Sequence, residues 1–293
     1  MTITAALVKE VRERTGAGMM ECKKALVESA GDIDGAIEAL RIQGQAKADK
    51  KASRIAAEGL VAIKVSADRK SGVIVEVNSE TDFVAKQDDF RAFVDEVASL
   101  ALEGAPSDVE ALSTMQVGGK SVEAIVRDLV ARIGEKISIR RFARVDSDDG
   151  VVGSYVHGGR IGVIVGLTGG NEAVAKDIAM HVSWSNPVCI SAEDVPSDSL
   201  EKEKAILEAQ AVESGKPPEI VEKMVNGRLK KYLKEITLLG QPFVKDNDIE
   251  VGEFLTQNGG SVTRYVRFEV GEGIEKKTDN FAEEVMAQVR ESQ

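Results

Sequence analysis

The sequence predicts an α+β fold in which helices cover small antiparallel sheets. Residues 72–75 (Gly-Val-Ile-Val) return at 162–165, ninety positions later (162 − 72 = 90), and residues 84–86 (Val-Ala-Lys) return at 174–176 with the same offset. Apolar residues at alternate positions precede and flank these matches, and apolar residues every three or four positions follow them. An ungapped self-match of this kind indicates one supersecondary unit used twice, so we expect a duplicated core.

Composition limits the function classes. The chain has 293 residues and a formal charge of −11, from 49 acidic and 38 basic side chains. This length accommodates two or three domains, and the acidic excess favours protein partners over direct nucleic-acid or membrane binding. Two cysteines in different predicted domains offer no disulfide framework or zinc spacing, and no apolar run approaches the ~20 residues of a membrane span. We therefore expect a cytoplasmic protein.

The first forty residues predict a three-helix bundle. An amphipathic pattern ends at Gly16, a second runs from Met19 to near Gly31, and Asp32 caps a third. Because Met19 and Met20 are adjacent, they lie on different faces of a helix. We expect one of them in the bundle core and the other on a soft contact surface.

The first copy of the repeat predicts two strands, two helices and a third strand. Alternating apolar residues predict a strand at 61–65, a more continuously apolar run predicts a strand at 73–77, and a helix follows. A second helix begins at Ser121 and ends at Gly134, and the third strand covers 137–145. The first helix is expected to bury Phe90, Phe93, Val94, Val97 and Ala101.

The second copy contains an insertion. It begins at Val151, turns at 158–159 and closes with a strand at 262–270, because Arg267-Phe268 echoes Arg141-Phe142. This echo has an offset of 126 (267 − 141), so the second copy carries 36 extra residues (126 − 90). Two charged helical patterns account for them and predict an antiparallel helical hairpin. Its expected apolar seam consists of Leu207, Ala211, Val212, Ile220, Met224, Leu229, Leu233 and Ile236.

The predicted domains follow these elements. Residues 1–55 form the three-helix domain with its linker, and residues 56–146 form the first core half. Residues 147–275 form the second core half, with the inserted hairpin at about 197–238. A last amphipathic helix at 276–293 carries Phe281, Val285 and Val289 on one face.

The two copies disagree where the following helix begins. The first has Thr81-Asp82-Phe83, and the second has Asn171-Glu172-Ala173. An acid at a helix N-terminus suits both copies. If the third position were core in the shared fold, replacing Phe with Ala would cost ~3–5 kcal/mol. Phe83 is then either an outward aromatic anchor for a partner, or each copy packs its own helix differently; the comparison of copies leaves both open.

Motifs for covalent chemistry, a metal or a cofactor are not found. His157 and His181, the two histidines, have no acid or cysteine at metal-ligand spacing. The Gly166 to Gly170 stretch follows a strand and precedes a helix, so its amides could cradle a phosphate, although the lysine and hydroxyl of a P-loop are missing. A nucleotide-binding enzyme using this stretch is thus one alternative. Another is a structural adaptor that uses the N-terminal bundle and the helical hairpin.

Four stretches carry a specific family resemblance, at residues 12–20, 81–86, 153–158 and 267–273. Through them the chain resembles the bacterial translation elongation factor Ts family over essentially its whole length. The resemblance implies a nucleotide-exchange factor for the GTPase elongation factor Tu, with GDP or GTP bound to Tu and no covalent chemistry of its own. It also implies a ubiquitin-associated-like (UBA-like) bundle, a two-part core, a coiled-coil arm and a C-terminal helix. A homodimer or a complex of two Tu and two Ts chains stays open.

The resemblance also implies which residues contact Tu. The segment Thr81 to Val84 would displace magnesium, with Asp82 and Phe83 entering near the switch II helix. Ile133 and Gly134 would contact Tu beside this wedge, and His157 would act on the side of the phosphate-binding loop. The N-terminal contact surface would comprise Arg12, Met19 and Met20.

Overall fold

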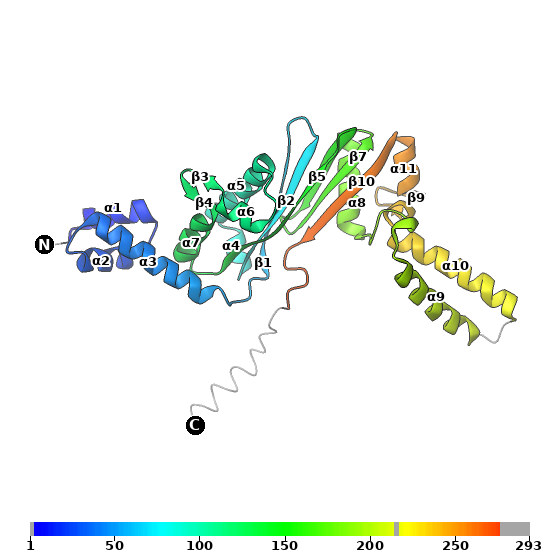
Figure 1. Ribbon diagram of the computed structural model, residues 1–293, viewed down its shortest axis with the longest axis horizontal. Helices are drawn as coiled ribbons and strands as arrows, with labels where there is room; N and C mark the ends of the chain where they lie inside the picture. The colour runs from blue at the N-terminus through cyan, green and yellow to red at the C-terminus, as the bar shows by residue number, and fades with distance from the viewer. Residues whose placement is uncertain (1–2, 214–216, 276–293) are drawn as a thin grey trace, which may run out of the picture.

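The computed structural model describes residues 3–213 and 217–275. The molecule is elongated, with a three-helix bundle at one end, two sheets with their helices in the middle and a helical hairpin at the other end (Figure 1). The mixture of helices and antiparallel sheets confirms the predicted α+β class. The helix predicted at 276–293 lies outside the described residues.

The N-terminal bundle follows its capping signals. Its helices are α1 (Ala5–Thr15), α2 (Met19–Glu28) and α3 (Ile33–Lys51). Gly16 adopts the left-handed conformation that ends α1, and the Asp32 side chain accepts hydrogen bonds from the amides of Asp34 and Gly35. The buried residues of this bundle are Val8, Val11, Cys22, Ala25, Leu26 and Ala36.

The first core half contains the predicted strands and helices in the predicted order and adds two short helices and a two-stranded hairpin that were not predicted. Its sheet has the order β1-β2-β5, all antiparallel, and its helices cover one face. The five apolar residues predicted on the first helix are all buried. The elements are β1 (Glu58–Val65), β2 (Ser71–Ser79), α4 (Asp82–Ala85), α5 (Asp88–Gly104), α6 (Val109–Thr114), β3 (Gln116–Val117), β4 (Lys120–Ser121), α7 (Val122–Ile133) and β5 (Ile137–Asp146).

The second core half repeats this sheet with the order β10-β7-β6. The inserted hairpin consists of α9 (Ser197–Val212) and α10 (Pro218–Ile236). The other elements are β6 (Gly150–His157), β7 (Ile161–Gly169), α8 (Glu172–Ser185), β8 (Pro242–Phe243), β9 (Asp246–Glu250), α11 (Val251–Gln257) and β10 (Gly260–Glu269), with single 3-10 turns at Ala192–Asp194 and Leu238–Gly240.

The pairing of β5 and β10 with their neighbours shows which residues of these two closing strands are equivalent, and it differs from the prediction. In the first half Glu76 pairs with Arg141, and in the second half Gly166, ninety positions after Glu76, pairs with Arg264. The structural offset of the closing strands is therefore 123 (264 − 141), and the surplus in the second half is 33 residues (123 − 90). The predicted values of 126 and 36 are wrong.

A β-bulge confirms the corrected register. The pairing shifts at Arg140 in β5 and at Thr263 in β10, which are again 123 residues apart (263 − 140). The echo between Arg141-Phe142 and Arg267-Phe268 is off by three residues, and an odd displacement moves a side chain to the opposite face of the sheet. A two-residue echo was too short to define the register.

The two sheets pack face to face. Gly72 and Gly162, which begin the repeated stretches, make this possible, because a Cβ atom would meet Ile164 at the first position and Val61 at the second. Larger apolar clusters lie on the outer faces, under α5 and α7 in one half and under α8 in the other. The buried residues between the sheets are Val61, Ile74, Val145, Val152, Ile164, Phe268 and Val270.

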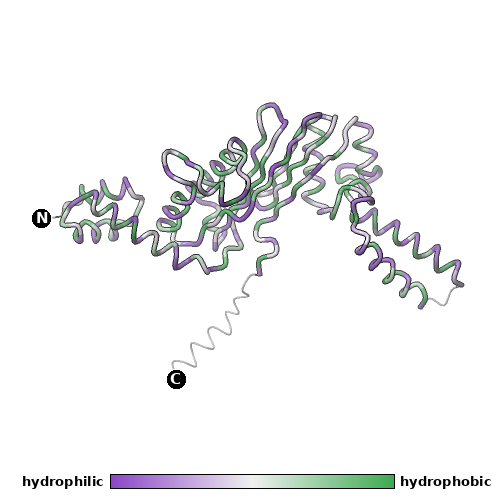
Figure 2. The backbone as a smooth tube through the Cα atoms, viewed as in Figure 1, coloured by the Kyte–Doolittle hydropathy of each residue, from purple (hydrophilic) through white to green (hydrophobic). Residues whose placement is uncertain are grey.

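The helical hairpin has a narrower apolar seam than predicted. Leu207, Ala211 and Val225 are its buried residues, whereas Val212 and Ile220 are exposed near the hairpin tip. Hydrophilic and hydrophobic residues alternate along both helices (Figure 2). Among the helices of residues 3–213 and 217–275, the structure shows none with the length and apolarity needed to cross a membrane.

Candidate partner-binding site

Phe83 lies on the outside of the molecule, in the four-residue helix α4. Its side chain is 73% exposed, and the equivalent Ala173 in α8 is exposed too. The repeated fold therefore places this position outward in both copies. Of the two interpretations of the Phe-to-Ala difference, the outward aromatic residue is the one observed. The ring is accompanied by Lys86, whose Nζ lies 5.4 Å from the ring centroid.

Asp82 supplies a negative charge beside this ring. Its Oδ2 accepts a hydrogen bond from Lys86 Nζ at 2.7 Å, and this bond is the main reason that the pKa of Asp82 lies below its ordinary value. The positive charge of Arg160, in the turn between β6 and β7, lowers the same pKa further. The turn of the second half thus lies within electrostatic range of α4.

Val84 is buried, unlike Asp82 and Phe83, which precede it. Its side chain is buried in the core of the first half together with Ala85. Side-chain contact between Val84 and a partner is therefore excluded in this conformation, and the residue holds α4 on the core instead. The chain then bends at Lys86 and Gln87 before α5 begins at Asp88.

Two glutamates clasp the turn before α4 to the end of α7. Thr81 donates from its amide to Glu135 Oε2 at 2.9 Å and from its hydroxyl to Glu135 Oε1 at 2.7 Å. In return, Glu80 Oε1 accepts a hydrogen bond from the amide of Lys136 at 2.6 Å. Hydrogen bonds to charged groups are among the stronger ones in proteins. This pair of reciprocal contacts, the glutamate clasp, rigidly positions the base of the turn that carries Phe83.

The clasp places Ile133 and Gly134 beside the turn. Glu135 directly follows them, Ile133 is half-buried, and Gly134 ends α7 in the left-handed conformation. The Gly134 carbonyl also accepts a hydrogen bond from Lys51, near the end of α3. The structure therefore brings together the two segments that the resemblance assigns to one contact surface.

His157 is exposed at the end of β6. Its Nδ1 lies 3.3 Å from the hydroxyl of Tyr155. The turn that follows is attached to the first half, because the Gly159 carbonyl accepts a hydrogen bond from the Val61 amide at 2.8 Å and Arg160 pairs with Glu58 at 2.5 Å. His157 therefore belongs to the edge of the core where β6 meets β1.

Arg12, Met19 and Met20 are all exposed on the N-terminal bundle. Arg12 is exposed, and the methionine side chains are 47% and 75% exposed. The prediction that one methionine is core is wrong. Both lie in the first turn of α2, and the buried residues of this helix begin at Cys22.

Comparison with known proteins identifies the family. A family model described as Elongation factor TS matches residues 80–272. This range includes the glutamate clasp and every element from α4 to β10. The chain belongs to the elongation factor Ts family. It is 61% identical to elongation factor Ts of Alkalilimnicola ehrlichii and 59% identical to that of Halorhodospira halophila, in each case over 100% of both chains. With elongation factor Ts of Thioalkalivibrio sulfidiphilus it shares 58% identity over 99% of both chains.

Membership of the elongation factor Ts family gives the chain a role in translation elongation.

In the glycine stretch considered for phosphate binding, backbone amides are already hydrogen-bonded within the fold. Gly166 to Gly169 form the end of β7, and the amides of Gly169 and Gly170 donate to the carbonyls of Asp149 and Gly259 at 3.2 and 3.0 Å. These two amides bind the residues just before β6 and β10, so they are not available for the phosphate cradle raised as an alternative.

Sequence reasoning missed Glu80 and Glu135 in this elongation factor Ts chain. Each is one of many acidic residues in a chain with 49 of them, and the two are 55 residues apart (135 − 80). Only the return of β5 alongside β2 brings them together. An acidic residue directly after one strand and another just before its antiparallel partner strand is the one local signal that could have found them.

Proposed function

We propose that this elongation factor Ts chain is a guanine nucleotide-exchange factor that accelerates release of GDP from elongation factor Tu. The observation that carries the proposal is the outward Phe83 ring on a clasped turn, at a position where the sister repeat has Ala173. The ring would wedge side chains apart near the switch II helix of Tu, and Asp82 would disturb the magnesium site. Nucleotide stays on Tu, and the chain carries out no covalent step.

The energetics require several contacts. An exchanger binds the nucleotide-free GTPase more tightly than the loaded one, and linkage makes the weakening of nucleotide equal to the weakening of exchanger. A thousandfold weakening needs ~4 kcal/mol of coupling. One buried aromatic anchor contributes ~2 kcal/mol or more. Loss of Mg²⁺ removes charge that neutralises the phosphates, and contacts from Ile133, Gly134 and His157 would add to the total.

The remaining surfaces extend the same interface. Arg12, Met19 and Met20 would contact Tu from the bundle, which we assign to the UBA-like class, with the inserted hairpin as a coiled-coil arm. The exposed methionines suit this role, because an unbranched thioether side chain adapts to a partner surface. The protein would work in the cytoplasm, where Tu acts on the ribosome.

The test is GDP release from Tu, measured by stopped-flow fluorescence with a labelled nucleotide. Phe83→Ala should lower kcat/KM for exchange by roughly 30-fold or more, the equivalent of a ~2 kcal/mol anchor. Its melting temperature should stay unchanged, because the ring is exposed. Trp184→Ala, which removes another exposed aromatic residue at the far end of α8, serves as the matched control.

Two results would contradict the proposal. The first is wild-type exchange by Phe83→Ala together with intact affinity for nucleotide-free Tu, which would remove the wedge. The second is saturable binding of GDP or ATP to the isolated protein in an equilibrium titration, which would favour a nucleotide-binding enzyme.

A further inference from the structure

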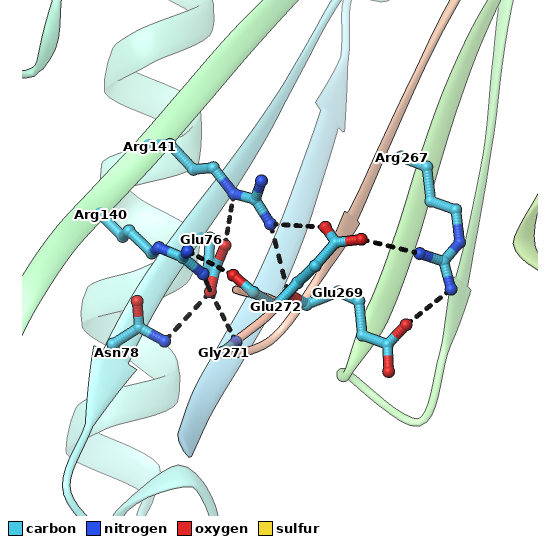
Figure 3. A network of polar contacts seen from close by, with 8 residues as sticks. All are labelled: Glu76, Asn78, Arg140, Arg141, Arg267, Glu269, Gly271 and Glu272. Atoms are coloured by element: carbon cyan, nitrogen blue, oxygen red, sulfur yellow. Dashed lines mark hydrogen bonds and ion pairs between the residues drawn. The ribbon is translucent and has the colours of Figure 1, made fainter. Parts of the chain in front are cut away.

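Glu76 is a fully buried carboxylate in the middle of β2. Figure 3 shows it enclosed by donors from three directions. Its Oε1 accepts hydrogen bonds from the Gly271 amide at 2.8 Å, from Arg140 at 3.0 Å and from Asn78 at 3.1 Å, and its Oε2 accepts one from Arg141 Nε at 2.6 Å. Burial alone would raise the pKa of Glu76, but these hydrogen bonds outweigh it and hold the pKa below the ordinary value.

This carboxylate joins the two core halves. Arg140 and Arg141 lie in β5 of the first half, whereas Gly271 follows β10 of the second half. Arg141 continues across the boundary, with Nη2 3.3 Å from the Glu269 carbonyl and 3.2 Å from Glu272 (Figure 3). The apolar contact between the sheets is non-directional. The charged network adds fixed bond directions to it.

The β-bulge makes this arrangement possible. An extra residue at Arg140 lets two consecutive arginines reach the same carboxylate, which a regular strand would prevent by pointing them to opposite faces. The bulge itself is shared with the second half, where Thr263 occupies it. The charges are not shared, since the position of Glu76 is taken there by Gly166.

The second half therefore folds its own sheet without such a carboxylate. A buried ion pair is weak support for stability, because desolvation offsets most of the attraction, and its best attested use is to specify one arrangement over others. In this chain the arrangement that the network specifies is the placement of β10 against β2. These two strands belong to different halves of the core.

We propose that Glu76 is a positioning residue for nucleotide exchange, which fixes the angle between the core halves and so the span between Phe83 and the His157 turn. Glu76 lies on the strand that leads into α4, seven residues before Phe83 (83 − 76 = 7). Gly271 terminates the sheet that carries the His157 turn. A partner that contacts both halves at once would meet them at this fixed spacing. The inference rests on the proposed function, because it concerns the same contact surface.

The experiment is a double-mutant cycle in the GDP-release assay with Tu. Glu76→Gln keeps the side-chain shape but leaves two arginines without their carboxylate. Arg141→Gln is the second variant, in case Glu76→Gln does not fold. Arg144→Gln is the matched control, because Arg144 lies on the same strand with the same 31% side-chain exposure, yet its ion pair with Asp146 stays within the first half.

Positioning predicts a background-dependent effect. Glu76→Gln and Arg141→Gln should each lower kcat/KM by about fivefold or more in the wild-type chain, and by less than about twofold in the Phe83→Ala chain, where no ring remains to be positioned. Arg144→Gln should stay within about twofold of wild type in both. Equal factors in the two backgrounds, or an Arg144→Gln effect as large as that of Arg141→Gln, would overturn the proposal.

A distance measurement separates this proposal from the proposed function. Spin labels at Glu96→Cys on α5 and Lys176→Cys on α8, with Cys22→Ala and Cys189→Ser, report the arrangement of the halves by pulsed EPR. Glu76→Gln should shift or broaden the distance distribution, and an unchanged distribution would overturn positioning whatever the kinetics show. Wild-type exchange by Phe83→Ala alone would instead overturn the proposed function, and with it the role assigned to Glu76.

Discussion

The turns that follow β2 and β7 bury a valine at the same position but lead into different helices. Val84 and Val174 are buried at equivalent positions, and the residue before each is exposed. In the second half the chain continues directly into α8, a helix of 14 residues. In the first half it makes one turn of helix, bends and starts again as α5. The duplication retained the packing positions and changed what projects from them.

The cap residues show how the first turn departs from the second. Asn171 caps α8 in the usual way, with its side chain accepting a hydrogen bond from the Val174 amide at 3.1 Å. The Thr81 hydroxyl donates to Glu135 instead, and α4 has no side-chain cap. The capping group is thus used to attach the turn to α7. The copy that exposes an aromatic residue is the copy that is clasped.

The largest effects should come from the buried valines. Val84→Ala and Val174→Ala each remove two methyl groups from a well-packed core and should each cost ~2 kcal/mol of unfolding free energy. Chemical denaturation should give similar losses for the two. Exchange measured well below the melting temperature should slow only for Val84→Ala, because only this valine supports Phe83. Equal slowing by Val174→Ala would show that the halves contribute alike.

The next effect concerns the clasp. Glu135→Ala removes both acceptors of Thr81 and should cost about 1 kcal/mol, since the carboxylate is partly exposed. Asn171→Ala removes the cap of α8 and should cost about as much. The two variants should therefore lose similar unfolding free energy, while exchange should slow severalfold only for Glu135→Ala. If both variants exchange at the wild-type rate, the clasp is structural only.

Much of this architecture could be predicted from periodicity, for a physical reason. A strand or helix with one buried face must repeat its apolar residues at the matching period, so the β2 strand, α5 and the repeat of β2 in β7 could be recognised. The outward position of Phe83 could be argued because two copies with one fold rarely place Phe and Ala at the same core position.

Other features depend on what the chain folds against. Periodicity places Met19 and Met20 on different faces at the start of α2, but which of these faces the bundle covers depends on how α1 and α3 pack against it. It likewise gives a seam for the hairpin, but Val212 and Ile220 lie past the point where the helices cover each other. Glu76 lies within a mostly apolar strand, and its charge can be buried because the bulge at Arg140 brings two arginines to it.

A smaller effect follows from pH and should appear in the second half alone. Burial lowers the pKa of His181, and its hydrogen bond with Gln241 opposes this only partly. In the unfolded chain the imidazole gains a proton near its ordinary pKa of 6.5, whereas in the folded chain it gains one only at lower pH. The stability contribution is therefore complete above pH 6.5 and falls as the pH drops below it.

Hydrogen exchange followed by mass spectrometry can locate this loss. Between pH 7.5 and 5.5, protection of α8 should decrease relative to α5 once the intrinsic exchange rates are corrected for pH. The first half contains no histidine, since His157 and His181 are both in the second. Earlier loss of protection in α5 would show that another group controls the acid sensitivity.

The smallest effect is expected from giving the second half the residue of the first. Ala173 is exposed at the start of α8, so Ala173→Phe should change the unfolding free energy by no more than about 0.5 kcal/mol. Combined with Phe83→Ala, it should also fail to restore GDP release from Tu. A ring at position 173 stands on a continuous helix, without the bend, the clasp or the Gly134 end of α7 beside it. Restored exchange in the double variant would mean that an exposed ring suffices on either repeat, whereas continued failure would mean that the ring acts only on the turn built to hold it.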